Sequence, residues 1–221
     1  MGGSPGTVLG AGHRGREVVV HPTALVEDGV ILGDHTRVWD NVHIRRNARI
    51  GKHVTVGEKS YVAYDVEIGD YVKINAFVYI CAGVTIEEMC MLSAGVVFTN
   101  DRFPRAMNRE LTALETSDPT DETLATRVRR GTTIGANATI GPGVTLGAFS
   151  MVGMGSVVTR NVPDQALVIG NPARVTGYVC VCGPRLVSLD RAPHSGTKLE
   201  CERCRRAYEW DGRSLIAESA P

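Results

Sequence analysis

Four cysteines near the C-terminal end have the residue type and spacing of a metal site. Cys180 and Cys182 form one close pair, and Cys201 and Cys204 form a second pair further along the chain. Thiolates placed in this way can converge tetrahedrally on one Zn²⁺. We therefore predict a structural zinc ion in a small ribbon-like segment over 179–221, which is too short to fold on a core of its own. Two disulfides are the alternative.

Polar and basic residues form a second group that could do chemistry, near the middle of the chain. Asn100 is followed closely by Asp101, Arg102 and Arg105, in a stretch that interrupts an otherwise regular pattern. A long excursion from a regular fold usually serves function, and binding residues concentrate on such loops. The pattern favours a functional loop over about 99–127, and a solvated loop without a role is the alternative.

A six-residue repeat must supply the elements that position these groups. An aliphatic or aromatic residue leads each hexad, and the fifth residue of each hexad is small or β-branched. No helical period of 3.6 residues runs through this region, whereas short strands joined by tight, glycine-rich turns fit it. The pattern predicts an all-β solenoid with the lead side chains pointing inward. The leads are Val20, Val26, Leu32, Val38, Ile44, Ile50, Val56, Val62, Ile68, Ile74, Ile80, Ile86, Leu92 and Phe98, then Val128, Ile134, Ile140, Leu146, Val152 and Val158.

Composition and charge exclude several classes of protein. The 221 residues include 24 lysines and arginines and 24 aspartates and glutamates, so the net charge is +0. This balance argues against a general nucleic-acid binder or a membrane-surface protein. The apolar-leaning uncharged run from Met89 to Thr99 is shorter than the about 20 residues of a membrane span. The first residues lack the apolar core of a signal peptide. We expect a soluble cytoplasmic protein with a flexible leader over 1–17.

The hexads and four further segments resemble the hexapeptide-repeat acyltransferases. HPTA at 21–24, TIGANATI at 133–140 and VIGNPAR at 168–174 are general to that family, whereas FTNDRFPRA at 98–106 is similar to the F-T-N-x-x-x-P-R-[AS] segment of nucleotide-sugar 3-N-acetyltransferases. Those enzymes act on UDP-2-acetamido-3-amino-2,3-dideoxyglucuronate or on dTDP-3-amino-3,6-dideoxyhexoses. The resemblance covers about 18–178.

This resemblance implies a left-handed parallel β-helix with three hexads to a coil. The hexads then make about six coils, which stand roughly 30 Å tall at the usual strand spacing. The resemblance also implies a homotrimer in which acetyl-CoA lies between two subunits, so that each active site is shared. The partners are acetyl-CoA as co-substrate and a nucleotide sugar as acceptor.

The resemblance assigns roles to individual residues. Asn100 falls on the asparagine that orients the reacting amine or hydrogen-bonds the carbonyl, beside the substrate-binding candidates of the loop. A neutral amine attacks a thioester without a strong base, so alignment and oxyanion stabilisation suffice. The expected contacts with acetyl-CoA fall on five positions: Ala136, Met154, Thr159, Arg160 and Arg174.

Residues 18 apart should stack on adjacent coils of such a helix. A histidine in these ladders could act as a general base, and a stacked surface histidine is the alternative. No histidine lies between His53 and His194, so a base must come from the early coils of a neighbouring subunit or is not needed. The expected ladders are His43, Tyr61 and Tyr79; His35, His53 and Tyr71; and Arg46, Tyr64, Ala82 and Asn100.

Two other functions compete with sugar N-acetylation. One is a different hexapeptide acyltransferase, acting on an amino acid or on tetrahydrodipicolinate. The other is a non-catalytic solenoid that serves as a scaffold. Glu58-Lys59 and Asp101-Arg102-Phe103 differ from the residues of glucuronate-type enzymes, so the sugar and the nucleotide stay open.

Overall fold

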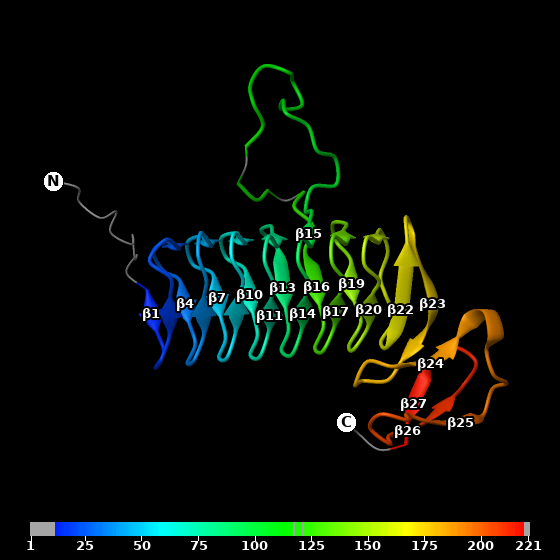
Figure 1. Cartoon of the computed structure of the whole chain (residues 1–221). Coiled ribbons are helices and arrows are strands. Elements are labelled where there is room, and N and C mark those ends of the chain that lie inside the picture. The colour runs from blue at the N-terminus through cyan, green and yellow to red at the C-terminus, as the bar shows by residue number, and fades with distance from the viewer. Residues whose placement is uncertain (1–11, 117, 121, 219–221) are drawn as a thin grey trace.

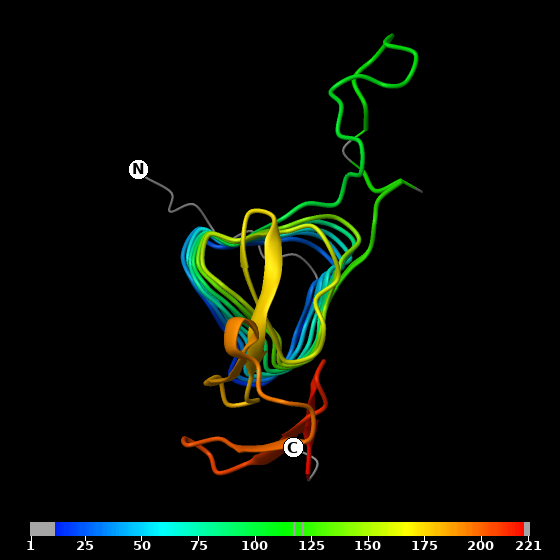
Figure 2. The same ribbon diagram turned by 90° about the vertical axis from the view of Figure 1, so that its right-hand side faces the viewer.

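In the computed structural model the chain forms a triangular prism with a long loop on one side and a small β-domain at one end. The structure describes residues 12–116, 118–120 and 122–218. Figure 1 shows the stacked coils from the side, and Figure 2 looks along the prism axis at its three flat faces. The expected left-handed parallel β-helix is confirmed.

Three parallel sheets form the faces of the prism, and each coil contributes one short strand to each face. Coil 1 is β1–β3 and coil 7 is β19–β21. Face 1 contains β1 (His13–Arg14), β4 (Ile31–Leu32), β7 (Arg49–Ile50), β10 (Glu67–Ile68), β13 (Val84–Ile86), β16 (Thr126–Val128) and β19 (Thr145–Leu146). Face 2 contains β2 (Val19–Val20), β5 (Arg37–Val38), β8 (Thr55–Val56), β11 (Lys73–Ile74), β14 (Met91–Leu92), β17 (Thr133–Ile134), β20 (Met151–Val152) and β22 (Ala166–Gly170). Face 3 contains β3 (Leu25–Val26), β6 (His43–Ile44), β9 (Tyr61–Val62), β12 (Tyr79–Ile80), β15 (Val97–Phe98), β18 (Thr139–Ile140) and β21 (Val157–Val158).

The core of the prism is built from the two inward positions of each hexad. The lead residues from Val26 onward are all buried, and Ile44, Ile74 and Ile134 are fully enclosed. The fifth residues, such as Val54 and Ser156, are buried beside them. Because side chains alternate across a strand, the residue before each lead points outward. The period of six therefore sorts the side chains into core and surface.

The three corners of the prism require left-handed backbone once per hexad. Corner 1 joins faces 1 and 2, corner 2 joins faces 2 and 3, and corner 3 joins faces 3 and 1. Glycine holds this position at Gly95, with φ of 73°, but His35 and Phe77 hold it elsewhere with φ of 60° and 59°. Glycine adopts this conformation without a Cβ clash, whereas other residues are strained in it. The corners therefore keep the same left-handed conformation even where the residue is not glycine.

The prism begins earlier than the sequence predicted. Strand β1 (His13–Arg14) pairs with β4, with His13 opposite Ile31. The prediction of a flexible leader over 1–17 is therefore wrong for its described part, and residues 1–11 lie outside the described residues. With this additional strand, the described chain makes seven complete coils rather than about six. Strand β1 has no apolar lead residue, so the hexad pattern could not reveal it.

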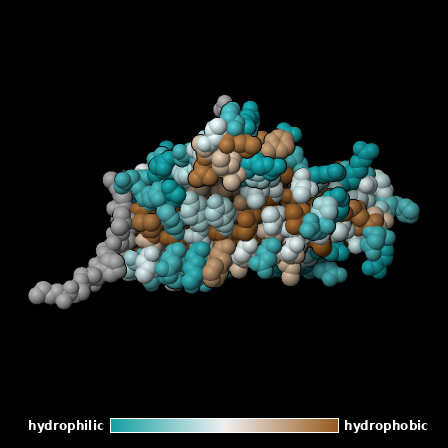
Figure 3. Space-filling view, turned by 90° about the horizontal axis from the view of Figure 1, so that it is seen from above, coloured by the Kyte–Doolittle hydropathy of each residue, from teal (hydrophilic) through white to brown (hydrophobic). Residues whose placement is uncertain are grey.

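The long loop leaves corner 3 after β15 and the chain rejoins the prism at β16. The two arms of the loop meet at an isolated antiparallel bridge between Asp101 and Thr123, and a second bridge joins Met107 and Leu114. Figures 1 and 2 show the loop standing away from the prism, beyond the corner from which it leaves. Seen from above, it covers the middle of the prism and presents apolar surface (Figure 3).

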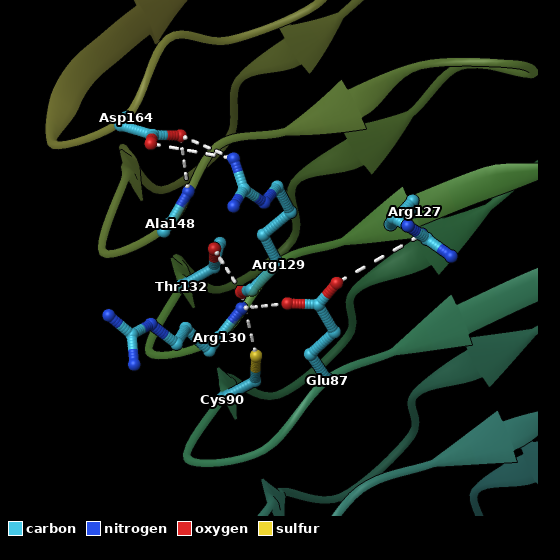
Figure 4. Close-up of polar contacts among 8 residues, drawn as sticks. All are labelled: Glu87, Cys90, Arg127, Arg129, Arg130, Thr132, Ala148 and Asp164. Carbon is cyan, nitrogen blue, oxygen red and sulfur yellow. Dashed lines mark hydrogen bonds and ion pairs between the residues drawn. The ribbon is translucent and has the colours of Figure 1, made fainter.

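Carboxylates fix the coil that follows the loop. Glu87 accepts a hydrogen bond from the Arg130 backbone N–H at 3.0 Å, one coil away. Asp164 accepts the Ala148 N–H at 2.8 Å and also pairs with the Arg129 guanidinium at 3.2 Å. Figure 4 shows these carboxylates reaching across successive turns of corner 1. Such contacts hold the returning chain in register after its excursion.

A hairpin and a small β-domain close the C-terminal end. Strand β23 (Ala173–Val179) runs antiparallel to β22, and the two lie across the open end of the prism (Figure 2). The chain continues through β24 (Arg185–Ser188), the short 3₁₀ helix η1 (Leu189–Arg191), β25 (Thr197–Glu200), β26 (Ala207–Trp210) and β27 (Leu215–Ala217). The last three strands form an antiparallel sheet of their own.

Candidate functional site

Asn100 lies at the point where the loop leaves corner 3. Its side-chain Nδ2 donates to the Ala82 carbonyl at 3.1 Å, one coil below. Its own carbonyl accepts the N–H of Leu124 at 3.1 Å, which closes the neck of the loop. Within the described residues no hydrogen bond to the Asn100 Oδ1 is found. The amide is thus held through its NH₂ group, and its oxygen is available to accept a hydrogen bond.

The three other loop candidates stand out in solvent. Asp101 takes part in the bridge at the neck, the Arg102 guanidinium stacks over its neighbour Phe103, and Arg105 donates to the Pro104 carbonyl at 2.8 Å. All three side chains are exposed and belong to the lining of an open hollow of about 900 Å³ between the arms of the loop. These three charged side chains therefore form no ion pair with the described prism of their own chain.

The residues expected to contact acetyl-CoA occupy two different corners. Ala136 and Met154 lie at corner 2 on coils 6 and 7, and the N–H of Gly155 donates to the Ala136 carbonyl at 2.8 Å. Met154 is 80% exposed. Thr159 and Arg160 follow β21 at corner 3, exposed and two coils beyond the loop. Ala136 and Met154 thus form one continuous strip along corner 2.

Arg174 lies outside both corners. It is on the terminal hairpin, opposite Ile169 on β22, and its side chain is exposed. The five positions therefore share the C-terminal half of the prism but do not converge on one point within a single chain.

Corner 3 and corner 2 lie at opposite ends of face 3. Ala136 precedes β18, whereas Asn100 follows β15, and these two strands pair in parallel with Val97 opposite Thr139. Parallel strands place their starts at one edge of the sheet and their ends at the other. One chain therefore separates the loop asparagine from the strip at corner 2 by the whole width of face 3.

The expected ladders are present. The His35 and His53 rings stack with centroids 4.7 Å apart, and His53 stacks on Tyr71 at 4.9 Å. On face 3, Tyr61 stacks on Tyr79 at 5.1 Å and His43 meets Tyr61 edge-on. These histidines lie on coils below the loop and do not approach Asn100.

A polar cluster on coils 1 to 3 escaped the sequence analysis. Glu27 Oε1 forms an ion pair with Arg45, 2.7 Å from its Nε, and lies 2.8 Å from His43 Nε2. Oε2 accepts a hydrogen bond from the Arg46 N–H at 2.9 Å. Burial raises the pKa of Glu27, but the hydrogen bonds from His43, Arg46 and Arg45 outweigh burial and lower it overall. The carboxylate therefore stays ionised and holds Arg45 in place.

Two guanidinium groups of this cluster share one aromatic ring. Arg45 and Arg46 lie over Tyr64 at 5.4 and 4.9 Å from the ring centroid, and Arg45 Nη1 donates to Tyr61 Oη at 3.0 Å. Tyr64 points away from the prism centre, as expected, but it is only 8% exposed. The sequence signal for this cluster was the adjacent pair Arg45–Arg46, because Tyr64 stands 18 residues after Arg46 and therefore one coil above it.

The four C-terminal cysteines converge. Their Sγ atoms all lie within 4.8 Å of one another, with Cys180 to Cys204 at 3.4 Å and Cys182 to Cys201 at 3.5 Å. All are free thiols rather than disulfides. A hydrogen bond from the Arg206 backbone N–H lowers the pKa of Cys204 to about 6.

Comparison with known proteins identifies the repeat. The family profile of the bacterial transferase hexapeptide, described as six repeats, matches residues 29–64, 47–81, 65–100 and 125–160. A curated protein of Aneurinibacillus thermoaerophilus, dTDP-3-amino-3,6-dideoxy-alpha-D-galactopyranose 3-N-acetyltransferase, is 51% identical over 65 residues. That match covers 29% of this chain and 34% of the relative, so the chain matches about a third of the relative's length.

A solved structure shares the fold. AntD, an N-acyltransferase from Bacillus cereus in complex with dTDP and 3-hydroxybutyryl-CoA, superposes with a TM-score of 0.52 and 17% identity, over 77% of this chain and 84% of that one. PerB from Caulobacter crescentus, in complex with CoA and GDP-perosamine, gives a TM-score of 0.41 and 25% identity, over 72% and 58%. In the described part of this chain no helix has the length and apolar character to cross a membrane.

Proposed function

Because the chain is a hexapeptide-repeat protein of the bacterial transferase type, we propose that it is an acetyl-CoA-dependent N-acetyltransferase. The acceptor is the 3-amino group of a sugar linked to UDP or dTDP. One observation carries this proposal: the 51% identity to a dTDP-3-amino-sugar 3-N-acetyltransferase over 65 residues. The position of Asn100 at the neck of the loop supports it, because a polar group there borders both the loop and the prism.

Asn100 acts on the acceptor amine in this proposal. One of its two Nδ2 hydrogens is engaged with the Ala82 carbonyl, and Oδ1 can accept an N–H of the incoming amine. This contact directs the nitrogen lone pair at the thioester carbonyl carbon. The second Nδ2 hydrogen could donate to the thioester carbonyl, so both roles expected from the sequence stay open.

The reaction balances without a side-chain base. The amine nitrogen forms a bond to the acetyl carbon, the C–S bond breaks, and the departing CoA sulfur takes the proton that the amine loses. The protein contributes alignment of the reactants and polar groups near the developing oxyanion. The histidines are on coils below the loop, which agrees with a mechanism of this kind.

We further propose a homotrimer in which two chains build each active site. Corner 2 of one chain, with Ala136 and Met154, would bind the pantetheine of acetyl-CoA. Corner 3 of the next chain would provide Asn100. Support comes from the parallel pairing of β15 and β18, which keeps these corners apart within one chain. Closed cyclic symmetry is the common way to bring two different surfaces of identical chains together.

Arginines at the C-terminal end suit the phosphates of CoA. Arg160 and Arg174 are exposed on the last coil and on the terminal hairpin, and Thr159 precedes the first of them. A guanidinium is a planar fork that matches phosphate oxygens in pairs. Acetyl-CoA thus extends from the loop toward the C-terminal end of the prism. On the loop, Asp101, Arg102 and Arg105 remain our candidates for contact with the sugar.

A structural zinc ion is the group that best fits the four cysteines. Tetrahedral coordination with Zn–S bonds of about 2.3 Å needs sulfurs about 3.8 Å apart, close to the separations of 3.4 and 3.5 Å between neighbouring Sγ atoms. Four adjacent thiolates repel one another unless a cation lies among them. Cys180, Cys182, Cys201 and Cys204 would hold the ion, and free thiols agree with a reducing cytoplasm.

Release of free CoA thiol tests this function. Acetyl-CoA is incubated with the full chain and a panel of UDP- and dTDP-linked 3-amino sugars, with the matching 4-amino sugars as controls. We expect thiol release with a 3-amino sugar and none with its 4-amino isomer. If no sugar of the panel causes thiol release but acetyl-CoA still binds, the acceptor is a different class of compound. If acetyl-CoA does not bind either, the result favours a non-catalytic scaffold.

A further inference from the structure

The Arg45–Arg46 pair, together with Glu27, Tyr61 and Tyr64, has the build of an anion site. Arg45 is 29% exposed and is held on two sides, by Glu27 at 2.7 Å and by Tyr61 at 3.0 Å. An arginine fixed in this way loses little freedom when it binds an oxyanion, which strengthens the contact. The site therefore has one guanidinium already in position.

Arg46 adds a second guanidinium whose charge is poorly compensated. Its side chain is 51% exposed, and its ion-pair partner among the described residues is Asp118 of the loop, at 3.8 Å. A pair this long between exposed groups is weak. Glu27 and Asp118 are the carboxylates that pair with the two arginines, and Asp118 is 72% exposed on the loop and free to be displaced. A dianion could replace it over the Tyr64 ring.

The position of this pair relative to Asn100 limits what it could bind. Arg46, Tyr64, Ala82 and Asn100 follow one another up corner 3, and Asn100 donates to Ala82 directly. The guanidinium groups lie over Tyr64, two coils below Asn100, and two coils span about 10 Å at the spacing of parallel strands. In a nucleotide sugar, one pyranose ring and one phosphoester separate the 3-amino group from the diphosphate, which is a comparable reach.

The donor side leaves only this direction for the acceptor. The positions proposed for acetyl-CoA all lie on coils 6 and 7 or beyond, on the C-terminal side of Asn100. The reacting amine must therefore approach Asn100 from the N-terminal side, where Arg45 and Arg46 stand. Next to them on face 3, the stacked rings of Tyr61 and Tyr79 offer a flat surface to a base.

We propose that Arg45 and Arg46 bind the diphosphate of the nucleotide-linked acceptor, with Asp118 as the group that the diphosphate displaces. The proposal rests on the proposed function, because it assumes a nucleotide-sugar acceptor at Asn100. Glu27 is a positioning residue in it, since it acts through Arg45.

Binding of free nucleoside diphosphates, measured by titration calorimetry, tests the subsite without turnover. The probes are dTDP and UDP, and the variants of the full chain are Arg46→Gln, Arg45→Lys and Asp118→Asn. We expect Arg46→Gln to weaken the binding of the preferred nucleotide by about tenfold, the loss of one charge-assisted contact, and Asp118→Asn to strengthen it. Arg49→Gln, an exposed arginine of face 1 on coil 3, is the matched control and should bind as the wild type does.

Kinetics on the same variants separate this proposal from the proposed function. Arg46→Gln should raise the KM for the nucleotide sugar and leave the KM for acetyl-CoA unchanged. If 3-amino sugars are acetylated but Arg46→Gln and Arg45→Lys bind dTDP and UDP as the wild type does, the subsite is wrong and the function stands. If neither nucleotide binds the wild-type chain and no nucleotide sugar is acetylated, both proposals fail together.

Discussion

At the scale of single residues, the proposed role of Asn100 depends on a hydrogen bond from its side chain to the coil below. Asn100 uses its NH₂ group to bond the Ala82 carbonyl, and this leaves the amide oxygen for the acceptor. The sequence could single out Asn100, because the loop segment around it is specific. It could not show which end of the amide is engaged, since that depends on a backbone carbonyl 18 residues away.

The contacts around Glu27 could not be predicted from the sequence for a related reason. A period of six assigns each side chain to the inside or the outside, but Arg45 and Arg46 fold along corner 3 and meet a ring on the next coil. The conformation of a long, flexible side chain depends on the neighbouring groups that it can contact, which the repeat does not specify. Tyr64 is therefore outward in the repeat and yet buried.

Replacing the amide of Asn100 tests its role directly. Asn100→Ala should lower kcat by about 100-fold, the typical loss when one polar contact to the reacting groups is removed. Equilibrium binding of acetyl-CoA, measured by calorimetry, should not change. Asn108→Ala, which removes another loop asparagine that bonds only within the loop, is the control. Wild-type turnover in Asn100→Ala would remove this residue from the mechanism.

The lowered pKa of Glu27 makes part of the stability depend on pH. A carboxyl whose pKa is lower in the folded chain than its ordinary value of 4.5 stabilises the fold above that value, and this stabilisation is lost as the pH falls through the lower, folded-state pKa. We expect Glu27→Gln to melt below the wild type near neutral pH. The difference in Tm should shrink as the pH falls below about 4.5; a constant difference down to strongly acidic pH would contradict the assignment.

At the scale of elements, the hexads predicted the strands well because each inward position repeats without exception. The leads on either side of the loop are buried, and Phe98 fills the core on the coil from which the loop departs. Strand β1 escaped prediction because it has no apolar lead residue and both of its side chains are exposed. Patterns of burial cannot reveal a strand whose side chains remain in solvent.

The return of the chain after the loop depends on Glu87. This carboxylate accepts the Arg130 N–H and lies 4.0 Å from Arg127 (Figure 4). Glu87→Ala should lower the free energy of unfolding by about 1 kcal/mol, as expected for one hydrogen bond to a charged acceptor that is partly exposed. Urea denaturation measures it. Glu88→Ala removes the neighbouring carboxylate and should lower the free energy of unfolding by less. Equal decreases for the two variants would contradict a specific role of Glu87 in the return of the chain.

The C-terminal domain should depend on its metal. Trp210 is buried in the three-stranded sheet of the ribbon, whereas Trp39 is exposed on the prism. In a Trp39→Phe background, chelation of zinc should therefore shift the Trp210 emission to the red as the ribbon opens, because structural zinc supplies folding energy to small domains.

Metal content supplies the control for this experiment. The wild type should carry zinc, Cys201→Ser should lose it, and Cys90→Ser should keep it because that thiol lies in the prism core, where burial raises its pKa to about 12. Absence of bound metal together with an unchanged Trp210 spectrum after chelation would rule the zinc out.

At the scale of the whole molecule, the prism places the groups proposed for the two substrates in order along its axis. Groups proposed for acetyl-CoA lie toward the C-terminal end, and the arginine pair proposed for the nucleotide lies toward the N-terminal end, with Asn100 between them. The hexads did not predict the nucleotide end of this order. They also did not predict that face 3 separates corner 2 from corner 3, which follows from the direction of its strands.

Subunit complementation tests most directly the claim that two chains build one acetyl-transfer site. Asn100→Ala damages corner 3 alone, and Ala136→Trp, which puts a bulky ring on the pantetheine strip, damages corner 2 alone. Each variant by itself should keep no more than about 1% of the wild-type turnover. Co-expressed chains should recover about a quarter of the wild-type sites, because random assembly in a ring brings one intact corner 2 against one intact corner 3 at that frequency. Mixtures of the separately purified variants serve as the control and should stay inactive. Recovery of CoA release in the co-expressed sample is the result that we predict, and its complete absence in an assembly shown to contain both chains would contradict the shared site.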